Sequence, residues 1–304
     1  MAPLKTHIHQ ASERGLSSVT TLITGPSHCA LIDPPFLIPD ADSVVSWIRS
    51  STPNPLVAVF ITHHHPDHYF SANPILDAFP AAKLYAAPYV CTAIDREYDE
   101  KVQYWPAKLG ADLVPTRPRK PEPYPFSFFS LDGGVVVLLG PVQGDSIDNT
   151  IFWLPAERTV IVGDIIYARS THVWAEEIET PAIWAGWMST LDTIEALNPE
   201  TIVPGHLEEG WKMDAKADLA HTRKYLELFR EKIANAPKKV TVDEVFKTFK
   251  DAFPQADKNL DFFLGHLANQ FGEGGEVWEA NRHHRVGLKE RKELQGYILP
   301  LPET

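Results

Sequence analysis

Four histidines and one aspartate fall within six consecutive residues of this chain, in the run His63-His64-His65-Pro66-Asp67-His68. The run follows directly on residues 56–61, an uninterrupted apolar segment of the length of a buried β-strand. Imidazole nitrogens and carboxylate oxygens are the ligands that divalent metals prefer. A turn that leaves a strand can direct His63 and His65 towards one metal ion while Asp67 and His68 face a second ion. The sequence therefore predicts a metal site at the end of a strand.

On both sides of this cluster the sequence alternates between strand-like and helix-like segments. A hairpin is expected at 18–33, and further strands at 56–61, 83–87, 126–131, 135–139, 150–154, 159–162 and 201–203. Helical periodicity marks 42–51, 69–79 and 90–101, and then 214–235, 242–252 and 260–271 in a C-terminal part without strands. The five prolines of 115–125 predict a connector with no regular structure. Two sheets with helices outside them are therefore expected.

The balance of charge argues against nucleic acid and anionic membranes as partners. The 304 residues carry 28 Lys and Arg against 40 Asp and Glu, a net charge of −12. Cys29 and Cys91 form no CxxC pair, which is typical of a reducing compartment. The N-terminus has no apolar run of the kind a secretory signal needs, and no segment approaches the ~20 apolar residues that span a bilayer. We expect a cytoplasmic protein with a small-molecule substrate.

Residues 62–68 resemble the THxHxDH signature of the metallo-β-lactamase superfamily. Gly163-Asp164, after the segment 159–162, is similar to the family's strand-end aspartate that bridges two metal ions, and Pro204-Gly205-His206 to its last histidine ligand. The resemblance covers residues 18–206 and implies an α/β fold, a four-layer αβ/βα sandwich that holds a mono- or dinuclear metal site between two sheets. Residues 1–211 are then expected to form the catalytic domain, and 212–304 a helical extension packed on it.

The chain departs from the family at one ligand position. Where the family has a histidine after a glycine, this sequence reads Gly144-Asp145-Ser146, so Asp145 is expected to replace it, with Gln143 and Asp148 as alternatives. The resemblance implies two ligand sets joined by Asp164, which are His63, His65 and Asp145 on one ion and Asp67, His68 and His206 on the other. We expect two Zn²⁺ per chain. A carboxylate at 145 makes the centre less positive, which suits Mn²⁺ or Fe²⁺ somewhat better than an all-histidine site would, so these ions are the alternatives.

The expected chemistry is hydrolysis. Two metal ions about 3.5–4 Å apart lower the pKa of a shared water towards 7, and the resulting hydroxide attacks a carbonyl that the metal polarises. The resemblance implies that Asp67 also shuttles a proton to the leaving group. The sequence has no GxSxG elbow, P-loop or GxGxxG motif for other chemistries. We interpret the chain as a detoxifying lactamase or lactonase; the alternatives are a glyoxalase II-like thioesterase and a non-catalytic metal-dependent ligand-binding protein.

Aromatic residues that follow Asp164 are candidates for a substrate pocket. Tyr167, Trp174, Trp184 and Trp187 could wall a flat apolar substrate, or they could pack in the core. His172 lies among them and is either a catalytic proton-transfer residue or a hydrogen-bonded structural histidine. In the general character of its sequence, and not through a motif, the chain also resembles fungal enzymes that hydrolyse benzoxazolinone-type cyclic carbamates. The sequence leaves its oligomeric state open.

Overall fold

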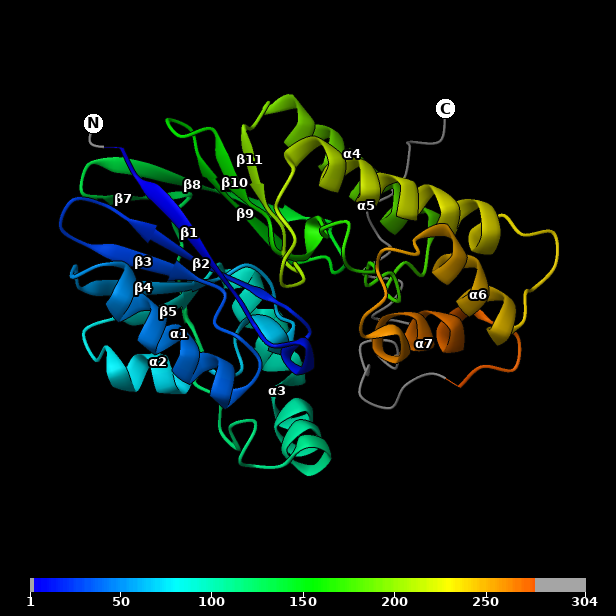
Figure 1. The fold of residues 1–304 in the computed structure, drawn as a ribbon, viewed down its shortest axis with the longest axis horizontal. Helices are drawn as coiled ribbons and strands as arrows, with labels where there is room; N and C mark the ends of the chain where they lie inside the picture. Colours follow the sequence, from blue (N-terminus) through cyan, green and yellow to red (C-terminus); the bar gives the residue numbers. More distant parts are fainter. Residues whose placement is uncertain (1–2, 277–304) are drawn as a thin grey trace, which may run out of the picture.

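The computed structural model describes residues 3–276 and shows two facing β-sheets with helices on their outer sides (Figure 1). Residues 1–2 and 277–304 lie outside the described residues, and so does the end of the expected extension. The first sheet is antiparallel from β1 to β3 and parallel from β3 to β6. Its strands, in spatial order, are β1 (Lys5–Gln10), β2 (Val19–Thr24), β3 (Cys29–Ile32), β4 (Leu56–Ile61), β5 (Lys83–Ala86) and β6 (Glu122–Pro123).

The second sheet lies against the first and has the order β11-β10-β9-β8-β7. Only its edge pair β10 and β11 is parallel; the other neighbours are antiparallel. Its strands are β7 (Phe128–Leu131), β8 (Gly134–Val142), β9 (Asn149–Leu154), β10 (Thr159–Ile161) and β11 (Thr201–Val203). Phe60 of β4 packs between the sheets, its ring 4.8 Å from that of Phe129 and 5.6 Å from that of Phe152. Aromatic contacts of this kind hold the two sheets together.

Helices cover the outer face of each sheet. On the first sheet, α1 (Ile38–Ser51), α2 (Ala72–Ala78) and α3 (Pro88–Leu109) share one hydrophobic core cluster with β2 to β5. On the second sheet, α4 (Pro181–Ala196) and α5 (Ala215–Phe229) pack over β9, β10 and β11. Because β4 is covered by helices on one side and by the second sheet on the other, it is apolar throughout. The expected four-layer αβ/βα sandwich is confirmed.

The described part of the C-terminal extension continues the core of the second sheet. α5 runs into a π-helical turn at Arg230–Ala234, and α6 (Val242–Ala252) and α7 (Leu260–Phe271) follow. One cluster of buried side chains joins Ile202 of β11 to Phe249 of α6 and Leu264 of α7. The division of the chain at residue 211 stays a prediction. No helix within residues 3–276 has the length and apolar character needed to cross a membrane.

Three elements differ from the sequence-based expectation. β1 was not expected because its sequence, KTHIHQ, is polar; it forms through a six-residue antiparallel register with β2. The helix α4 was not expected, because the tryptophans and small residues at its start obscure the helical periodicity. It begins at the N-cap Thr180, with Pro181 in its first turn. The connector 115–125 was expected to lack regular structure, but its residues Glu122–Pro123 pair with the end of β5, an edge position that tolerates proline.

Candidate metal centre

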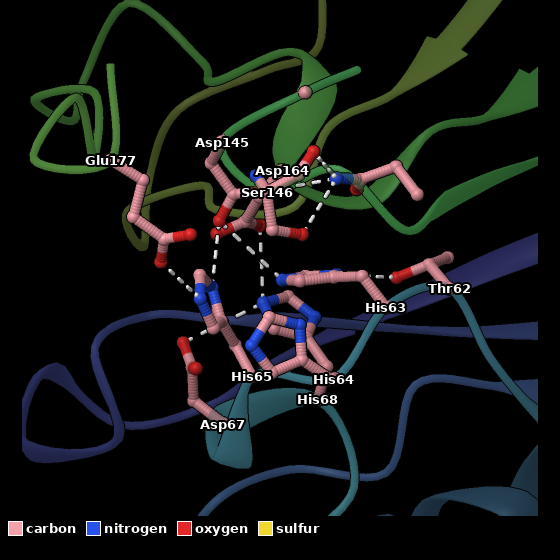
Figure 2. A network of polar contacts seen from close by, with 12 residues as sticks. Thr62, His63, His64, His65, Asp67, His68, Asp145, Ser146, Asp164 and Glu177 are labelled. Carbon is pink, nitrogen blue, oxygen red and sulfur yellow. Dashed lines mark hydrogen bonds and ion pairs between the residues drawn. The ribbon is translucent and has the colours of Figure 1, made fainter. Parts of the chain in front are cut away.

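The histidine cluster lies where β4 ends, at the edge between the two sheets (Figure 2). Three further segments, far apart in the sequence, meet it there. Asp145 comes from the loop between β8 and β9, Asp164 from a 3₁₀ turn directly after β10, and His206 from the residues that follow β11. Strand ends from both sheets thus supply the histidines and aspartates that meet here.

Two glycines allow the segments to approach closely. Gly163 has a φ of 52°, in the left-handed region, and a Cβ there would lie 2.5 Å from Oγ1 of Thr62. A Cβ at Gly205 would lie 1.8 Å from Oδ1 of Asp164. Any side chain at Gly205 would therefore displace the carboxylate of Asp164, which explains why glycine stands between the strand end and His206.

The structure brings all seven sequence-predicted ligand residues into two adjoining groups. His63, His65, Asp145 and Asp164 form one, and Asp67, His68, Asp164 and His206 form the other. In each group one possible ligand atom per residue lies within 4.8 Å of the others. Asp164 belongs to both groups, which is the position of a carboxylate between two ions. The alternative Asp148 belongs to neither group, and the other alternative, Gln143, donates from its side-chain amide to the backbone carbonyls of Gly144 and Ser146 at 2.9 and 3.0 Å.

His63 and His68 are oriented by hydrogen bonds on one ring nitrogen. Nδ1 of His63 lies 2.9 Å from Oγ1 of Thr62, and Nδ1 of His68 lies 3.1 Å from Oδ2 of Asp33. Asp33 in turn accepts hydrogen bonds from the backbone N–H and the hydroxyl of Thr62, at 2.7 and 2.8 Å. Both histidines therefore present Nε2 to the centre, as ligand histidines do when a second partner fixes the ring.

His65 and His206 are held in the same way. Nε2 of His65 lies 2.8 Å from Oε1 of Glu177, so its Nδ1 faces Oδ2 of Asp145 at 2.7 Å (Figure 2). Nδ1 of His206 donates to the backbone carbonyl of Leu16 at 2.8 Å, which leaves Nε2 directed at Asp164. The four imidazoles thus direct their remaining nitrogens to a common region.

Several buried atoms at this centre lack a hydrogen-bond partner among the described residues. They are Nε2 of His63, Nε2 of His68, Oδ2 of Asp145 and Oδ1 of Asp164. Nε2 of His68 lies 3.0 Å from Oδ1 of Asp164, and Nδ1 of His65 lies 2.7 Å from Oδ2 of Asp145, yet neither contact has the geometry of a hydrogen bond. Buried polar atoms without partners are costly, and cations held by the two groups would satisfy them. The donor set of imidazoles and carboxylates fits a divalent metal.

Asp145 is positioned by its own loop. Its Oδ1 accepts hydrogen bonds from the backbone N–H of Ser146 at 2.8 Å and from Nδ2 of Asn149 at 3.1 Å, so Oδ2 faces the histidines. Asp148 pairs with Nδ1 of His64 at 2.7 Å instead. His64 is the one histidine of the run outside both groups, and it pairs with Asp148 instead of joining the ligand residues.

The pKa directions of His63 and Asp164 agree with a cation-binding role. Burial lowers the pKa of His63 well below its ordinary value, so its ring is neutral and has a lone pair to donate. Burial opposes ionisation of Asp164, but His206 and His68 outweigh it and hold the pKa of this carboxyl well below its ordinary value. Burial raises the pKa of Asp145 to about 6 despite the neighbouring His65. A cation beside Asp145 would favour its ionised form.

A pocket of about 450 Å³, counting its open mouth, lies over this centre. Its floor is formed by His65, Asp67, Asp164 and His206. One side of the wall contains Phe36 and Trp105, whose rings meet edge to face at 4.9 Å. Trp174 also lines the pocket and stacks on Phe262 of α7 at 5.1 Å, so the extension contributes to the wall.

The other predicted pocket residues lie elsewhere. Trp187 is fully buried and donates its Nε1–H to the carbonyl of Ile165 at 2.9 Å, while Trp184 donates to the carbonyl of Leu226 at 2.8 Å. Neither lines the pocket. Tyr167 lies beneath the centre, where its hydroxyl donates to Oδ2 of Asp164 at 2.6 Å. The tryptophans after Asp164 thus divide into one pocket residue and two packing residues.

His172 is not brought to the centre. Its ring is completely buried, 5.8 Å from that of Tyr225 and 6.3 Å from that of Phe253, beneath α5 and the α6–α7 connection. Burial lowers the pKa of His172 to about 3, with a further contribution from His221. A base of that pKa does not exchange protons readily near pH 7, so this position fits the packing alternative.

Several residues of the site were missed in the sequence, among them three charged ones. Asp33 supports His68 and Thr62, but its neighbours Pro34 and Pro35 suggested only a stop after a strand. Glu177, which holds His65, and Lys101, which lines the pocket, have no local signal. The position of Asp33 at the carboxyl end of a strand beside β4 is the one clue that could have found it.

Comparisons with known proteins agree with this geometry. The family model described as the metallo-beta-lactamase superfamily matches residues 14–206. DIM-1 metallo-beta-lactamase exposed to ceftazidime has 17% sequence identity and a TM-score of 0.52, and the alignment covers 74% of this chain and 92% of that one. VMB-1 at pH 5.5 has the same identity, TM-score and coverages. A metallo-beta-lactamase from Pontibacter korlensis has 15% identity and a TM-score of 0.51, with 75% of this chain and 96% of that one covered. At such identities the likeness shows the fold alone. No curated protein matches the chain.

The family match covers more than half of the chain and includes every segment that supplies a side chain to the two ligand groups. The fold likeness covers 74% of the chain. This chain belongs to the metallo-β-lactamase superfamily.

Proposed function

We propose that this protein is a metal-dependent hydrolase that opens a small cyclic amide or ester, with zinc as the first choice of metal. Family membership and the candidate metal ligands support hydrolysis in general. The observation that carries the finer proposal is the pair of ligand groups that share Asp164 on the floor of an aromatic-walled pocket. A ring that lies flat between aromatic side chains would place its carbonyl over that floor.

Divalent ions bound by these groups would supply an activated water and polarise the scissile carbonyl. The chain's own residues prepare the site for them. Thr62, Asp33, Glu177 and the carbonyl of Leu16 fix the histidine rings before any ligand binds. A prearranged ligand set spends no free energy on reorganisation during the reaction.

Asp67 is the side chain best placed to move a proton. It lines the pocket, and its Oδ2 lies 3.4 Å from Nε2 of His206 and 3.5 Å from Nε2 of His68. It is also more exposed than the buried Asp164, so a substrate can reach it. Asp67 can therefore accept a proton at the floor and deliver it to the leaving nitrogen or oxygen of the opened ring.

Tyr167 has a supporting role. Its buried hydroxyl donates to Oδ2 of Asp164, and its ring stacks on that of His206 at 5.2 Å. Burial raises the pKa of Tyr167 well above its ordinary value, so the phenol stays protonated and remains a donor. It therefore fixes the carboxylate that the two ligand groups share.

The proposal is tested by reconstituting the chelated protein with zinc, manganese or iron and assaying dihydrocoumarin, 2-benzoxazolinone and a glutathione thioester. We expect ring opening that chelation abolishes and metal restores, and that His206→Ala removes. The exposed His28→Ala variant serves as the matched control and keeps the activity, because His28 neither lines the pocket nor belongs to a ligand group. Turnover of the thioester alone would identify a thioesterase, and metal binding with no turnover a ligand-binding protein; either result would overturn ring opening.

A further inference from the structure

Two buried polar side chains lie beside the ligand residues without belonging to either ligand group. His64 stands between His63 and His65 in the sequence and is 7% exposed, and Asp148 follows Asp145 by three residues and is 4% exposed. Nδ1 of His64 lies 2.7 Å from Oδ1 of Asp148, although 84 residues separate them along the chain. This contact therefore connects the loop that follows β4 to the loop between β8 and β9.

The same two loops supply most of one ligand group. The first ligand group consists of His63, His65, Asp145 and Asp164, and the second of Asp67, His68, Asp164 and His206. The loop after β4 contributes residues to both groups, whereas the loop between β8 and β9 contributes Asp145 to the first group alone. A contact that fixes the β8–β9 loop therefore bears on the first group and leaves the ligands of the second in place.

A series of hydrogen bonds runs from His64 to the ligand Asp145. Oδ1 of Asp148 also accepts a hydrogen bond from Oγ of Ser146 at 2.7 Å, and the backbone N–H of Ser146 donates to Oδ1 of Asp145 at 2.8 Å. Nδ2 of Asn149 donates to Oδ1 of Asp145 and to Oγ of Ser146, both at 3.1 Å. All these side chains are buried, where hydrogen bonds of a network are stronger than in water. Oδ1 of Asp145 is thus held by its own loop, and Oδ2 faces the histidines.

The position of that loop decides whether Asp145 can serve as a ligand. Its Oδ2 lies 2.7 Å from Nδ1 of His65 and 3.6 Å from Nε2 of His63. The carboxylate oxygen of an aspartate lies one bond closer to Cα than Nε2 of a histidine does, so an aspartate reaches an ion only if its backbone lies close to the ion. Residues that orient a metal ligand from outside are worth about 10–100-fold in metal affinity.

We propose that Asp148 is a positioning residue for the first ligand group: its contact with His64 holds the β8–β9 loop against the end of β4, and Asp145 meets the histidines as a result. The other ring nitrogen of His64, Nε2, faces Oε2 of Glu97 on α3 at 3.6 Å, so the ring is held at both nitrogens. This role rests on the metal-dependent part of the proposed function and is independent of the substrate. Asp148 acts through Asp145 and takes no part in bond cleavage.

The first test measures metal binding rather than turnover. Competition with a chromophoric chelator gives the Zn²⁺ affinity, and the Co²⁺ absorption spectrum reports the ligand geometry, for wild type, Asp148→Ala and Asp148→Asn. Asp148→Ala should weaken one of two bound Zn²⁺ at least tenfold and change the Co²⁺ spectrum. Asp148→Asn should stay within threefold of wild type, because its Oδ1 can still accept both hydrogen bonds. Wild-type affinity at both sites in Asp148→Ala, or equal weakening of both, would overturn the assignment.

Asp132→Ala is the matched control. Oδ1 of Asp132 lies 2.7 Å from Nδ1 of His28 and 2.6 Å from Oγ of Ser27, so it links the turn between β2 and β3 to the turn between β7 and β8 through contacts of the same kind. Asp132 belongs to neither ligand group and does not line the pocket. The control should bind both ions as wild type does; a loss equal to that of Asp148→Ala would mean that any loosened loop weakens metal, and would refute a specific role.

A double-mutant cycle tests whether Asp148 acts through Asp145. In the His206→Ala variant, which lacks a histidine of the second group, the addition of Asp148→Ala should weaken the remaining site at least tenfold. In the Asp145→Ala variant the same addition should change the Zn²⁺ affinity less than twofold, because the residue that Asp148 positions is gone. An equal loss with and without Asp145 would contradict the positioning role. If Asp148→Ala does not fold, His64→Leu removes the same contact from the other loop and takes its place in the cycle.

These results are separable from those of the proposed function. Selective weakening of one ion in a protein that opens no lactone or lactam would keep the role of Asp148 and refute ring opening. Ring opening by a wild type whose Asp148→Ala variant binds both ions normally would do the reverse.

Discussion

The buried His172 should make the stability of the fold depend on pH in a measurable way. Its pKa is lowered to about 3 by burial and by His221, whereas a histidine in an unfolded chain titrates near 6.5. Below pH 6.5 the unfolded chain therefore binds a proton that the folded chain does not. The stability that depends on a neutral His172 is complete above pH 6.5 and is lost as the pH falls towards 3. Each pH unit below 6.5 costs about 1.4 kcal/mol, so about 2 kcal/mol is lost between pH 7 and pH 5.

The assay is urea unfolding of wild type and His172→Gln at pH 7 and at pH 5, with the same saturating zinc concentration. The variant loses packing at both pH values, but its further loss on acidification should be about 2 kcal/mol smaller than that of wild type. The metal ligands titrate alike in both proteins and cancel from the comparison. His221→Gln should reduce the pH dependence similarly, because burial lowers the pKa of His221 to about 4. Equal pH dependence in wild type and His172→Gln would refute the reasoning, since it would mean that the folded protein protonates His172 without cost.

Three further predictions concern the centre and its pocket. Asp145→Ala should lower the metal content measured by elemental analysis, because Oδ2 of Asp145 faces the histidines. Asp145→His should keep the metal and favour zinc over manganese. Full metal content and an unchanged rate in the alanine variant would mean that the ligand is misassigned. Gly205→Ala should reduce metal content, since its Cβ would lie 1.8 Å from Oδ1 of Asp164 and 2.7 Å from the backbone of Gly163. Gly265→Ala, with no atom of the described residues within 4 Å of the added Cβ apart from its own helix, should bind metal normally. Trp174→Ala should raise KM for a flat cyclic ester more than tenfold, whereas Trp187→Ala should cost ~3–5 kcal/mol of stability and leave KM unchanged. A rise in KM for Trp187→Ala alone would move the pocket wall to Trp187.

Local sequence was sufficient to predict the bounds of an element wherever the element's own residues set them. The bounds of β4, β11, α6 and α7 coincide with the segments expected from periodicity and apolar runs. α6 is the clearest case, because a capping box formed by Thr241 and Glu244 marks its start and its apolar stripe marks the buried face. The histidine run was likewise readable, since metal ligands of its type follow a strand end within a few residues. These features depend on neighbours along the chain.

Sequence alone determined the fold class and the residue types of the metal centre, while only the tertiary structure decided what surrounds them. Trp174 and Trp187 stand in similar aromatic, small-residue surroundings, yet Trp174 lines the pocket and Trp187, on α4, is fully buried. Asp33, Glu177 and Lys101 reach the site from three distant segments, and no local pattern points to them. Periodicity reports which side of an element is buried, but it does not report which distant element covers that side. The partners of a side chain therefore depend on how the two sheets and the C-terminal helices close over the strand ends.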